Sequence, residues 1–287
     1  MDMDNLALRV GHIDYLNCVP FFHYLEECDF TGTIVKGVPA QLNAMLSRGE
    51  LDTSPSSSFE YARNFGDYYL LPGHSISAMG PVESVLLFTP EPLEKMEGQK
   101  IFLTGESATS VNLLHVLLRA FYGWCSVDAE VPSGPVEELI DRGYPALLIG
   151  DRALAARMKY LTSSVRCYDL ASLWYEHTGL PFVFALWIVR RDALPQKNDL
   201  LARFHHQLLL SRQKAFAQLG LLAQRQLERC PLMTPEQIAA YWRLISYDLQ
   251  SPHLDGLKRF FAYCLEYGLL SSKPELHFVP GLPCCTG

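Results

Sequence analysis

The first half of the chain alternates short apolar segments with helical patterns, and this alternation restricts the fold more than any other feature. Strand-like segments occur at Leu8–Ile13 and Thr33–Lys36, and helical patterns follow at 20–27 and 39–48. A β-α-β-α order is typical of α/β proteins in which helices cover the faces of a mostly parallel sheet. We therefore predict an α/β fold built on such a sheet.

This alternation is interrupted once and then begins again. Pro90 and Pro92 exclude regular structure, and beyond them a strand pattern at 100–103 leads into a helix that begins near Ser107. From Leu194 onward the pattern is helical only. Its amphipathic segments cover about 198–228, 235–246 and 252–269.

The interruption predicts two α/β lobes. Residues 1–94 and 187–287 would form lobe one, and residues 95–186 would form lobe two as a continuous insert. Two-lobed α/β proteins hold small ligands in the cleft between the lobes, where strand ends and helix N-termini converge.

Composition excludes several classes of function. The formal charge is −7 and basic residues form no block, which excludes a protein that follows a nucleic-acid backbone. The longest apolar stretch, Leu180–Val189, is too short to span a bilayer. The first five residues are acidic and polar, unlike a secretory signal. We expect no nucleic-acid or membrane partner, and the sequence does not indicate an oligomeric state.

Cysteine and histidine spacing points to reduced thiols and to no metal. The eight cysteines include no C-x-x-C pair, which favours a cytoplasmic protein, and Cys284-Cys285 is predicted to be a mobile tail. Adjacent histidines such as His205 and His206 project about 100° apart on a helix and cannot share a metal ion. No other histidine spacing matches a metal motif.

Two hydroxyl clusters, at 54–58 and 107–110, each lie where a strand ends and a helix begins. Such positions form anion sites, although serine and threonine are also ordinary helix N-caps. One cluster in each lobe favours a small anionic ligand held across the cleft. The candidate binding residues are Ser56, Ser57, Ser107, Thr109 and Ser110.

Three further segments supply candidates with alternatives that stay open. Asn17 follows the first strand and could bind a ligand or form an Asx-turn. The run 178–185, which includes Phe182, could line the cleft or form a buried strand after a helix stop. Asp14 and Asp151 lie at strand ends, where turn or cap roles explain them. Composition and spacing alone leave the chemistry undetermined.

The chain also resembles a known family over residues 8–190. The matching segments are Arg9-Val10-Gly11, Tyr15-Leu16-Asn17 with Pro20, Pro39-Ala40-Gln41-Leu42-Asn43, Gly49-Glu50-Leu51-Asp52, residues 55–62, Val82-Glu83-Ser84-Val85, Ser107-Ala108-Thr109-Ser110-Val111, residues 146–151 and residues 174–187. They resemble the chorismate dehydratases of the futalosine route to menaquinone. The resemblance implies a two-lobed type II periplasmic-binding-protein-like fold with an inter-lobe cleft. A sister enzyme, 1,4-dihydroxy-6-naphthoate synthase, shares that fold and a Thr-Gly-Leu-Pro turn, but the continuation 182–187 is similar to the dehydratase.

The resemblance implies a hydro-lyase that converts chorismate to 3-[(1-carboxyvinyl)oxy]benzoate and water without a cofactor or a metal. It assigns catalysis to Asn17 and Ser84. The implied substrate-binding residues are Ser56, Ser57, Ser107, Thr109, Ser110, Val111, Asp151 and Phe182. No Glu, His or Lys in these motifs is predicted as the base, so we expect the side-chain carboxylate of the substrate to take the proton. The alternatives are the sister activity and a non-catalytic small-anion binding protein.

Overall fold

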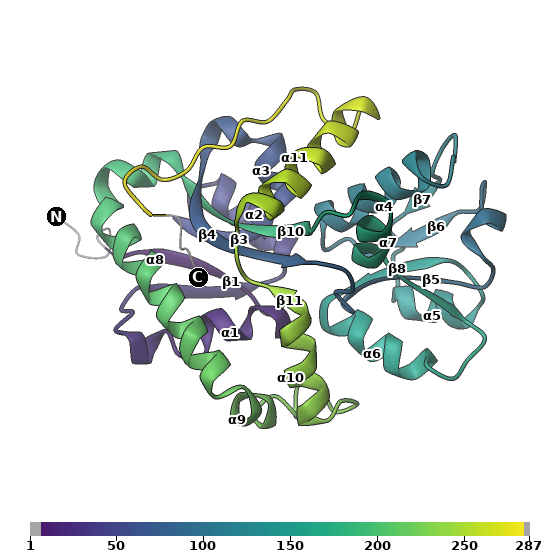
Figure 1. Ribbon diagram of the computed structural model, residues 1–287, viewed down its shortest axis with the longest axis horizontal. Coiled ribbons are helices and arrows are strands. Elements are labelled where there is room, and N and C mark those ends of the chain that lie inside the picture. The colour runs from purple at the N-terminus through teal and green to yellow at the C-terminus, as the bar shows by residue number, and fades with distance from the viewer. Residues whose placement is uncertain (1–6, 284–287) are drawn as a thin grey trace.

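The computed structural model describes residues 7–283 and contains two mixed β-sheets, each with its own helices (Figure 1). The first sheet has the strand order β11-β4-β10-β3-β1-β2. Its strands are β1 (Arg9–Ile13), β2 (Thr33–Gly37), β3 (Thr53–Ser57), β4 (Tyr68–Ala78), β10 (Phe182–Arg190) and β11 (Ile245–Ser246). The second sheet has the order β7-β6-β8-β5-β9. Its strands are β5 (Val85–Thr89), β6 (Ile101–Leu103), β7 (Ala129–Glu130), β8 (Ala146–Ile149) and β9 (Arg166–Asp169).

Both sheets are mixed, although four strands of each sheet run in the same direction. In the first sheet β1 is parallel to β2 and β3, but β10 runs antiparallel to β3 and β4. In the second sheet β5 runs antiparallel to β8 and β9. The antiparallel pairs of β5 and β10 arise where the chain passes between lobes, since β5 enters the second sheet from the first lobe and β10 returns from it, and the short strand β11 adds an antiparallel pair with β4.

The lobe boundaries also differ from the predicted ones. The second sheet is formed by one continuous segment, but β5 already belongs to it, and β10 belongs to the first sheet. The chain therefore crosses between Ala78 and Val85, at least ten residues before 95, and returns before Phe182, about five residues before 186. Pro90 and Pro92 mark a loop inside lobe two, because a proline pair ends a strand wherever the strand lies.

The helices divide between the lobes and a C-terminal group. Lobe one contains α1 (Val19–Phe22), α2 (Pro39–Ser47) and α3 (Ser58–Arg63). Lobe two contains α4 (Ala108–Ala120), α5 (Val136–Asp141), α6 (Gly150–Tyr160) and α7 (Leu170–Thr178). The C-terminal group is α8 (Leu194–Ala217), α9 (Leu219–Gln224), α10 (Pro235–Leu244) and α11 (Ser251–Glu266). The long helix expected at 198–228 is divided in two, because Gln218 leaves the helical conformation.

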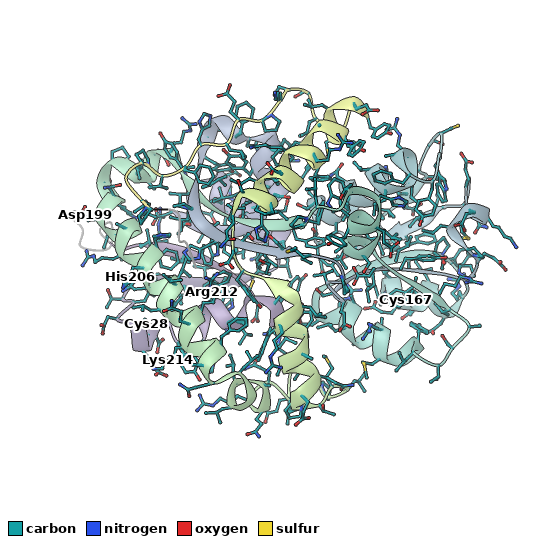
Figure 2. The ribbon with its side chains drawn as sticks, in the orientation of Figure 1. Cys28, Cys167, Asp199, His206, Arg212 and Lys214 are labelled. Carbon is teal, nitrogen blue, oxygen red and sulfur yellow. The ribbon has the colours of Figure 1, made fainter. Side chains whose placement is uncertain are left out.

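The C-terminal helices pack mainly on lobe one. Helix α8 packs against α1, and the labelled side chains of Asp199, His206, Arg212 and Lys214 trace its course in Figure 2. Helix α11 differs, because it contacts β10 of lobe one and α4 of lobe two. It crosses the upper side of the junction in Figure 1.

An aromatic cluster stabilises this junction. Trp174 of α7 is fully buried and packs edge-on against Phe182 of β10 and Phe260 of α11, with ring centroids 5.3 and 6.3 Å away. Truncating a buried aromatic ring of this size typically costs about 3–5 kcal/mol. The cluster therefore contributes substantially to holding α7, β10 and α11 together. No helix within residues 7–283 is both long and apolar enough to span a bilayer.

Candidate active site

A cavity lies between the two lobes, where strand ends and helix N-termini meet. Lobe one contributes Ile13, Tyr15, Asn17, Pro39, Ser57, Ile76, Phe184 and Ala185. The crossing segment and lobe two contribute Val82, Ser84, Val85, Ser107, Ser110, Ile149 and Gly150. Within residues 7–283 the lining includes no Asp, Glu, His, Lys or Arg. A ligand there meets apolar walls, hydroxyl groups and one amide.

Asn17 lines the cavity, and hydrogen bonds hold the backbone around it. It lies in the 3-10 helix η2 (Leu16–Cys18), whose backbone forms hydrogen bonds with three side chains distant in sequence. The Leu16 N–H donates to Asp151 Oδ1 at 2.8 Å, and Trp242 Nε1 donates to the Leu16 carbonyl at 2.7 Å. The Tyr247 hydroxyl donates to the Asn17 carbonyl at 3.0 Å. The Asn17 Oδ1 is buried and accepts no hydrogen bond from the described residues, which is uncommon unless a ligand supplies the donor.

Ser84 reaches the same cavity from the segment that crosses between the lobes. Its side chain is buried, and its hydroxyl donates a long hydrogen bond, at 3.3 Å, to the Val82 carbonyl. The Ser84 carbonyl accepts the Gly150 N–H at 2.8 Å, which ties it to the start of α6. The structure therefore brings Asn17 and Ser84 together around one cavity.

Three of the predicted hydroxyl groups also line this cavity. Ser107 caps α4, since its Oγ accepts the Ser110 N–H at 3.2 Å, and the two hydroxyl oxygens lie 3.1 Å apart. Ser57 caps α3 by accepting the Glu60 N–H at 3.1 Å. The N-terminal end of α4, which bears the positive end of the helix dipole, therefore faces the cavity with two hydroxyls.

Similarity to known proteins identifies the family of this chain. A protein-family model described as menaquinone biosynthesis matches residues 8–266. The chain belongs to this menaquinone-biosynthesis family. It is 33% identical over 266 residues to chorismate dehydratase of Thermus thermophilus, which covers 86% of this chain and 91% of the relative. It is 32% identical over 191 residues to chorismate dehydratase of Campylobacter jejuni, covering 64% of this chain and 69% of that one.

The sister enzyme is a more distant relative of this family member. The 1,4-dihydroxy-6-naphtoate synthase of Thermus thermophilus is 26% identical over 200 residues, covering 65% and 67% of the two chains. A solved protein of Archaeoglobus fulgidus superposes with a TM-score of 0.71 at 16% identity, over 92% of this chain and 98% of that one. The periplasmic aliphatic sulphonate binding protein of Escherichia coli does so with 0.61 at 16% identity, over 94% and 90%. The predicted periplasmic-binding-protein-like fold is confirmed.

Five residues predicted to bind substrate lie outside the cavity of this family member. Ser56 faces the opposite side of β3 from Ser57, because successive residues of a strand alternate. Val111 lines a separate groove between α2, α3 and α4. Phe182 belongs to the Trp174 cluster, and Phe184, two residues further along β10, lines the cavity instead.

Thr109 contacts lobe one of the protein and not the cavity. Its Oγ1 accepts the N–H of Phe59 at 3.0 Å and lies 3.3 Å from the Ser58 hydroxyl. This hydroxyl therefore satisfies an N–H at the start of α3 that was predicted to be open to an anion. The result is a hydrogen bond between the lobes beside the cavity.

Asp151 also joins the lobes. Its Oδ1 accepts the Leu16 N–H, and its Oδ2 lies 2.6 Å from Nε of Arg229, whose Nη1 lies 2.9 Å from Asp14 Oδ1. Both carboxylates are therefore occupied by Arg229. Both Asp151 oxygens already have partners in lobe one and the C-terminal region, and substrate binding by Asp151 stays a prediction.

Sequence analysis missed Tyr15 and Gly150 as lining residues. The Tyr15 hydroxyl donates to Glu106 Oε2 at 2.5 Å, and Arg152 Nη1 lies 3.1 Å from Glu106 Oε1. Burial, and then Glu106, raise the pKa of Tyr15 far above its usual value, so the phenol stays protonated. Gly150 has φ +60°, and a Cβ there would lie 3.0 Å from the Tyr15 ring. A glycine directly after a buried strand was the available signal.

His12 and Asp14 lie on one face of the chain at the end of β1, and it is the face away from the cavity. Both line an outer groove, whereas Ile13 between them lines the cavity. The His12 ring stacks on Phe22 at 3.8 Å. Burial, and then Lys36, lower the pKa of His12 to about 4, so the ring is neutral at pH 7. Within residues 7–283 no three His, Cys, Asp or Glu side chains form a group that could hold a metal ion.

Proposed function

We propose that the protein is a chorismate dehydratase that converts chorismate to 3-[(1-carboxyvinyl)oxy]benzoate and water. The similarity to the Thermus thermophilus enzyme of that name, along 86% of this chain, carries this proposal. The cavity between the lobes fits a small, partly apolar anion, because its walls are apolar and its polar groups are neutral. We further propose that it acts in the futalosine route, in the cytoplasm. The six described cysteines all carry free thiols, as expected in a reducing compartment.

Asn17 and Ser84 are proposed to act on the C4 hydroxyl, the leaving group. Ser84 can donate a hydrogen bond as the C4–O bond breaks and negative charge develops on oxygen. The open Oδ1 of Asn17 can accept the O–H of the substrate and fix its orientation. Donors and acceptors that are held in place before the reaction stabilise developing charge without reorganising.

The hydroxyl groups of Ser57, Ser107 and Ser110 are proposed to bind a substrate carboxylate. All three line the cavity, and two of them lie at the N-terminus of α4. The protein as a whole has a formal charge of −7, so attraction of a dianion must be local. The positive end of a helix dipole together with hydroxyl donors supplies such local attraction.

The base is proposed to be the side-chain carboxylate of the substrate itself. None of the described lining residues is a carboxylate, an imidazole or an amine, His12 and Asp14 face away, and the Tyr15 phenol is protonated. The enolpyruvyl carboxylate is tethered to C3, the carbon that loses its proton. Groups held in reactive geometry reach effective molarities of about 10⁵–10⁸ M. The C3 proton goes to this carboxylate, the C3–H electron pair forms the new ring double bond as the C4–O bond breaks, and the carboxyl proton then passes to the departing hydroxide, which leaves as water.

A chorismate assay tests the function. Purified protein incubated with chorismate should remove its absorbance and produce the benzoate ether, identified by mass spectrometry. An inert protein that binds chorismate would instead be a binding protein, and one that neither binds nor converts it would favour the sister activity. A chorismate analogue with only the side-chain carboxylate masked should bind without reacting. Turnover of that analogue at a similar rate would show that a protein group is the base.

A further inference from the structure

The segment that presents Ser84 to the cavity has an unusual backbone conformation. Glu83, directly before Ser84, has φ +59°, and it is one of only two non-glycine residues with positive φ among residues 7–283. L-residues other than glycine seldom adopt this conformation unless their surroundings impose it. Val82, Ser84 and Val85 on either side all line the cavity. Whatever holds Glu83 in this conformation therefore also determines where the Ser84 hydroxyl lies.

The carboxylate of Asp169 holds this turn. Its Oδ2 accepts the N–H of Val82 at 2.9 Å and the N–H of Glu83 at 2.6 Å. Its Oδ1 accepts the N–H groups of Ala171 and Ser172, at 3.0 and 3.2 Å, and so caps α7. One carboxylate thus accepts four backbone N–H groups and ties the crossing segment to the N-terminus of α7.

Asp169 is well placed for this contact and lies outside the active cavity. It is the last residue of β9 and stands opposite Leu86 of β5 in the sheet. The labelled Cys167 shows where β9 lies in Figure 2, on lobe two. Asp169 lines a groove on the outer side of the turn, where Arg157 also pairs with the Glu83 carboxylate at 3.0 Å. Asp169 can therefore influence a ligand only indirectly, through the turn or through α7.

We propose that Asp169 is a positioning residue for the dehydration, which holds the left-handed turn at Glu83 and so aims Ser84 at the leaving hydroxyl. This inference rests on the proposed function, because it assigns to Ser84 a role in that reaction. The N–H groups of Val82 and Glu83 have a fixed acceptor, and the Ser84 carbonyl is bound to the Gly150 N–H at 2.8 Å. The backbone is thus restrained on both sides of the Ser84 side chain.

The substitution Asp169→Ser distinguishes the two interactions of the carboxylate, which are the cap of α7 and the contact with the turn at residues 82 and 83. Serine is a good N-cap and can still accept an N–H of α7. Its single, shorter oxygen cannot also reach the N–H groups of Val82 and Glu83. We expect kcat with chorismate to fall roughly 10- to 100-fold, because displacements of about 1 Å at a reacting group have effects of this size. KM should change less than about threefold, since the groups proposed to bind the carboxylates are untouched.

Two double variants distinguish positioning from general loss of structure. In a Ser84→Ala background, Asp169→Ser should lower kcat by less than about twofold, because the hydroxyl to be aimed is already absent. Adding Glu83→Gly to Asp169→Ser should recover kcat several-fold, because glycine adopts positive φ without strain. Asp141→Ser, which removes an exposed carboxylate paired with Lys159, is the matched control and should retain the kcat of the unsubstituted protein.

The outcomes separate this inference from the proposed function. If the unsubstituted protein is inert toward chorismate, both fall together. If it is active and a folded Asp169→Ser variant retains its kcat, or loses as much in the Ser84→Ala background as alone, only the positioning role is refuted. Near-ultraviolet circular dichroism checks the fold. Should Asp169→Ser not fold, the isosteric Asp169→Asn serves instead, since one acceptor oxygen cannot bind both N–H pairs, and the same kcat criteria apply.

Discussion

Replacing Asp151 by Asn should loosen the closed arrangement of the two lobes. Asp151 belongs to α6 of lobe two, and its two oxygens bind the Leu16 N–H of lobe one at 2.8 Å and Arg229 Nε at 2.6 Å. Asparagine keeps one acceptor for Leu16 but places an N–H₂ group against the Arg229 guanidinium, which can only donate. The substitution therefore removes the charged hydrogen bond and leaves two donors facing each other.

The size of the effect follows from the exposure of the pair. Hydrogen bonds to charged groups contribute about 1.5–3 kcal/mol. The Asp151 and Arg229 side chains are 23% and 26% exposed, so solvent weakens the interaction and the lower part of that range applies. A loss of about 1.5–2 kcal/mol corresponds to a 10- to 30-fold shift away from the closed state. It should also lower Tm by roughly 3–8 °C.

The assay compares Asp151→Asn with Asp14→Asn. Asp14 is the other carboxylate of Arg229, at 2.9 Å from Nη1, and belongs to lobe one, so its loss weakens an ion pair without releasing lobe two. Asp151→Asn should raise KM for chorismate by up to the 10- to 30-fold shift in the closed population and expand the protein in small-angle X-ray scattering. Asp14→Asn should lower Tm slightly and leave KM unchanged. Equal KM values for both variants, with equal scattering profiles, would refute the inter-lobe role of Asp151.

Three further results are expected. Asn17→Ala and Ser84→Ala should each lower kcat by about 10²–10³-fold with smaller changes in KM, whereas raised KM at constant kcat would assign them to ground-state binding. Gly150→Ala should lower Tm and raise KM, because φ +60° costs a residue with a Cβ about 1–2 kcal/mol and the added methyl displaces the Tyr15 ring. An unchanged Tm in a thermal melt and an unchanged KM in a rate assay would contradict this. The pKa of His12 is about 4 in the folded protein and near 6.5 when unfolded, so the unfolded chain takes up a proton first and stability falls from pH 6.5 toward pH 4, by at most about 1.4 kcal/mol per pH unit. His12→Gln should flatten that part of a denaturation-versus-pH curve, and an unchanged slope would exclude His12 as its source.

Local signals predicted the helix ends well. Ser107 and Asp169 cap α4 and α7, and Gly179 ends α7 in the left-handed conformation. These ends depend on side chains within three residues of the cap, so a short window of sequence contains the information. The cap role expected for Asp151 is not observed, because its side chain bonds to lobe one and not to its own helix, α6.

Long-range packing explains what local signals could not predict. Residues 54–58 were interpreted as a cap, but Thr53–Ser57 is the fully buried strand β3, between β1 and β10. Proline and serine are poor strand formers, so no local pattern indicates it. A Cβ at Gly11 of β1 would lie 2.4 Å from Ser54 Oγ, which shows that β1 needs a glycine at this position to lie beside β3. The lobe boundaries failed for a similar reason, since membership of a sheet depends on partners distant in sequence.

The site predictions divide according to whether an oxygen already has a partner inside the protein. Hydroxyls and carboxylates at strand ends suit both a ligand and a contact between lobes, and sequence does not separate the two uses. Thr109 and Asp151 are bound to lobe one, whereas the Oδ1 of Asn17 is buried and has no partner among the described residues. An unsatisfied buried acceptor costs about 1–3 kcal/mol, which a bound ligand can recover. This cost is a physical reason to assign Asn17 to the substrate and the two other residues to lobe closure.

The contrast between groups that are already paired and groups that are open to a ligand also explains why the cavity is neutral, although we propose that it binds a dianion. Two arginines whose carboxylate partners bind Tyr15 or Leu16 are already paired, Arg229 with Asp14 and Asp151, and Arg152 with Glu106 and Glu137. Through these carboxylates the arginines hold the lobes together and fix the Tyr15 side chain, and neither arginine lines the cavity. An arginine inside the cavity would form an ion pair with the enolpyruvyl carboxylate and lower its basicity. Neutral donors leave that carboxylate able to accept the C3 proton, so the absence of cations from the described lining agrees with a substrate that supplies its own base.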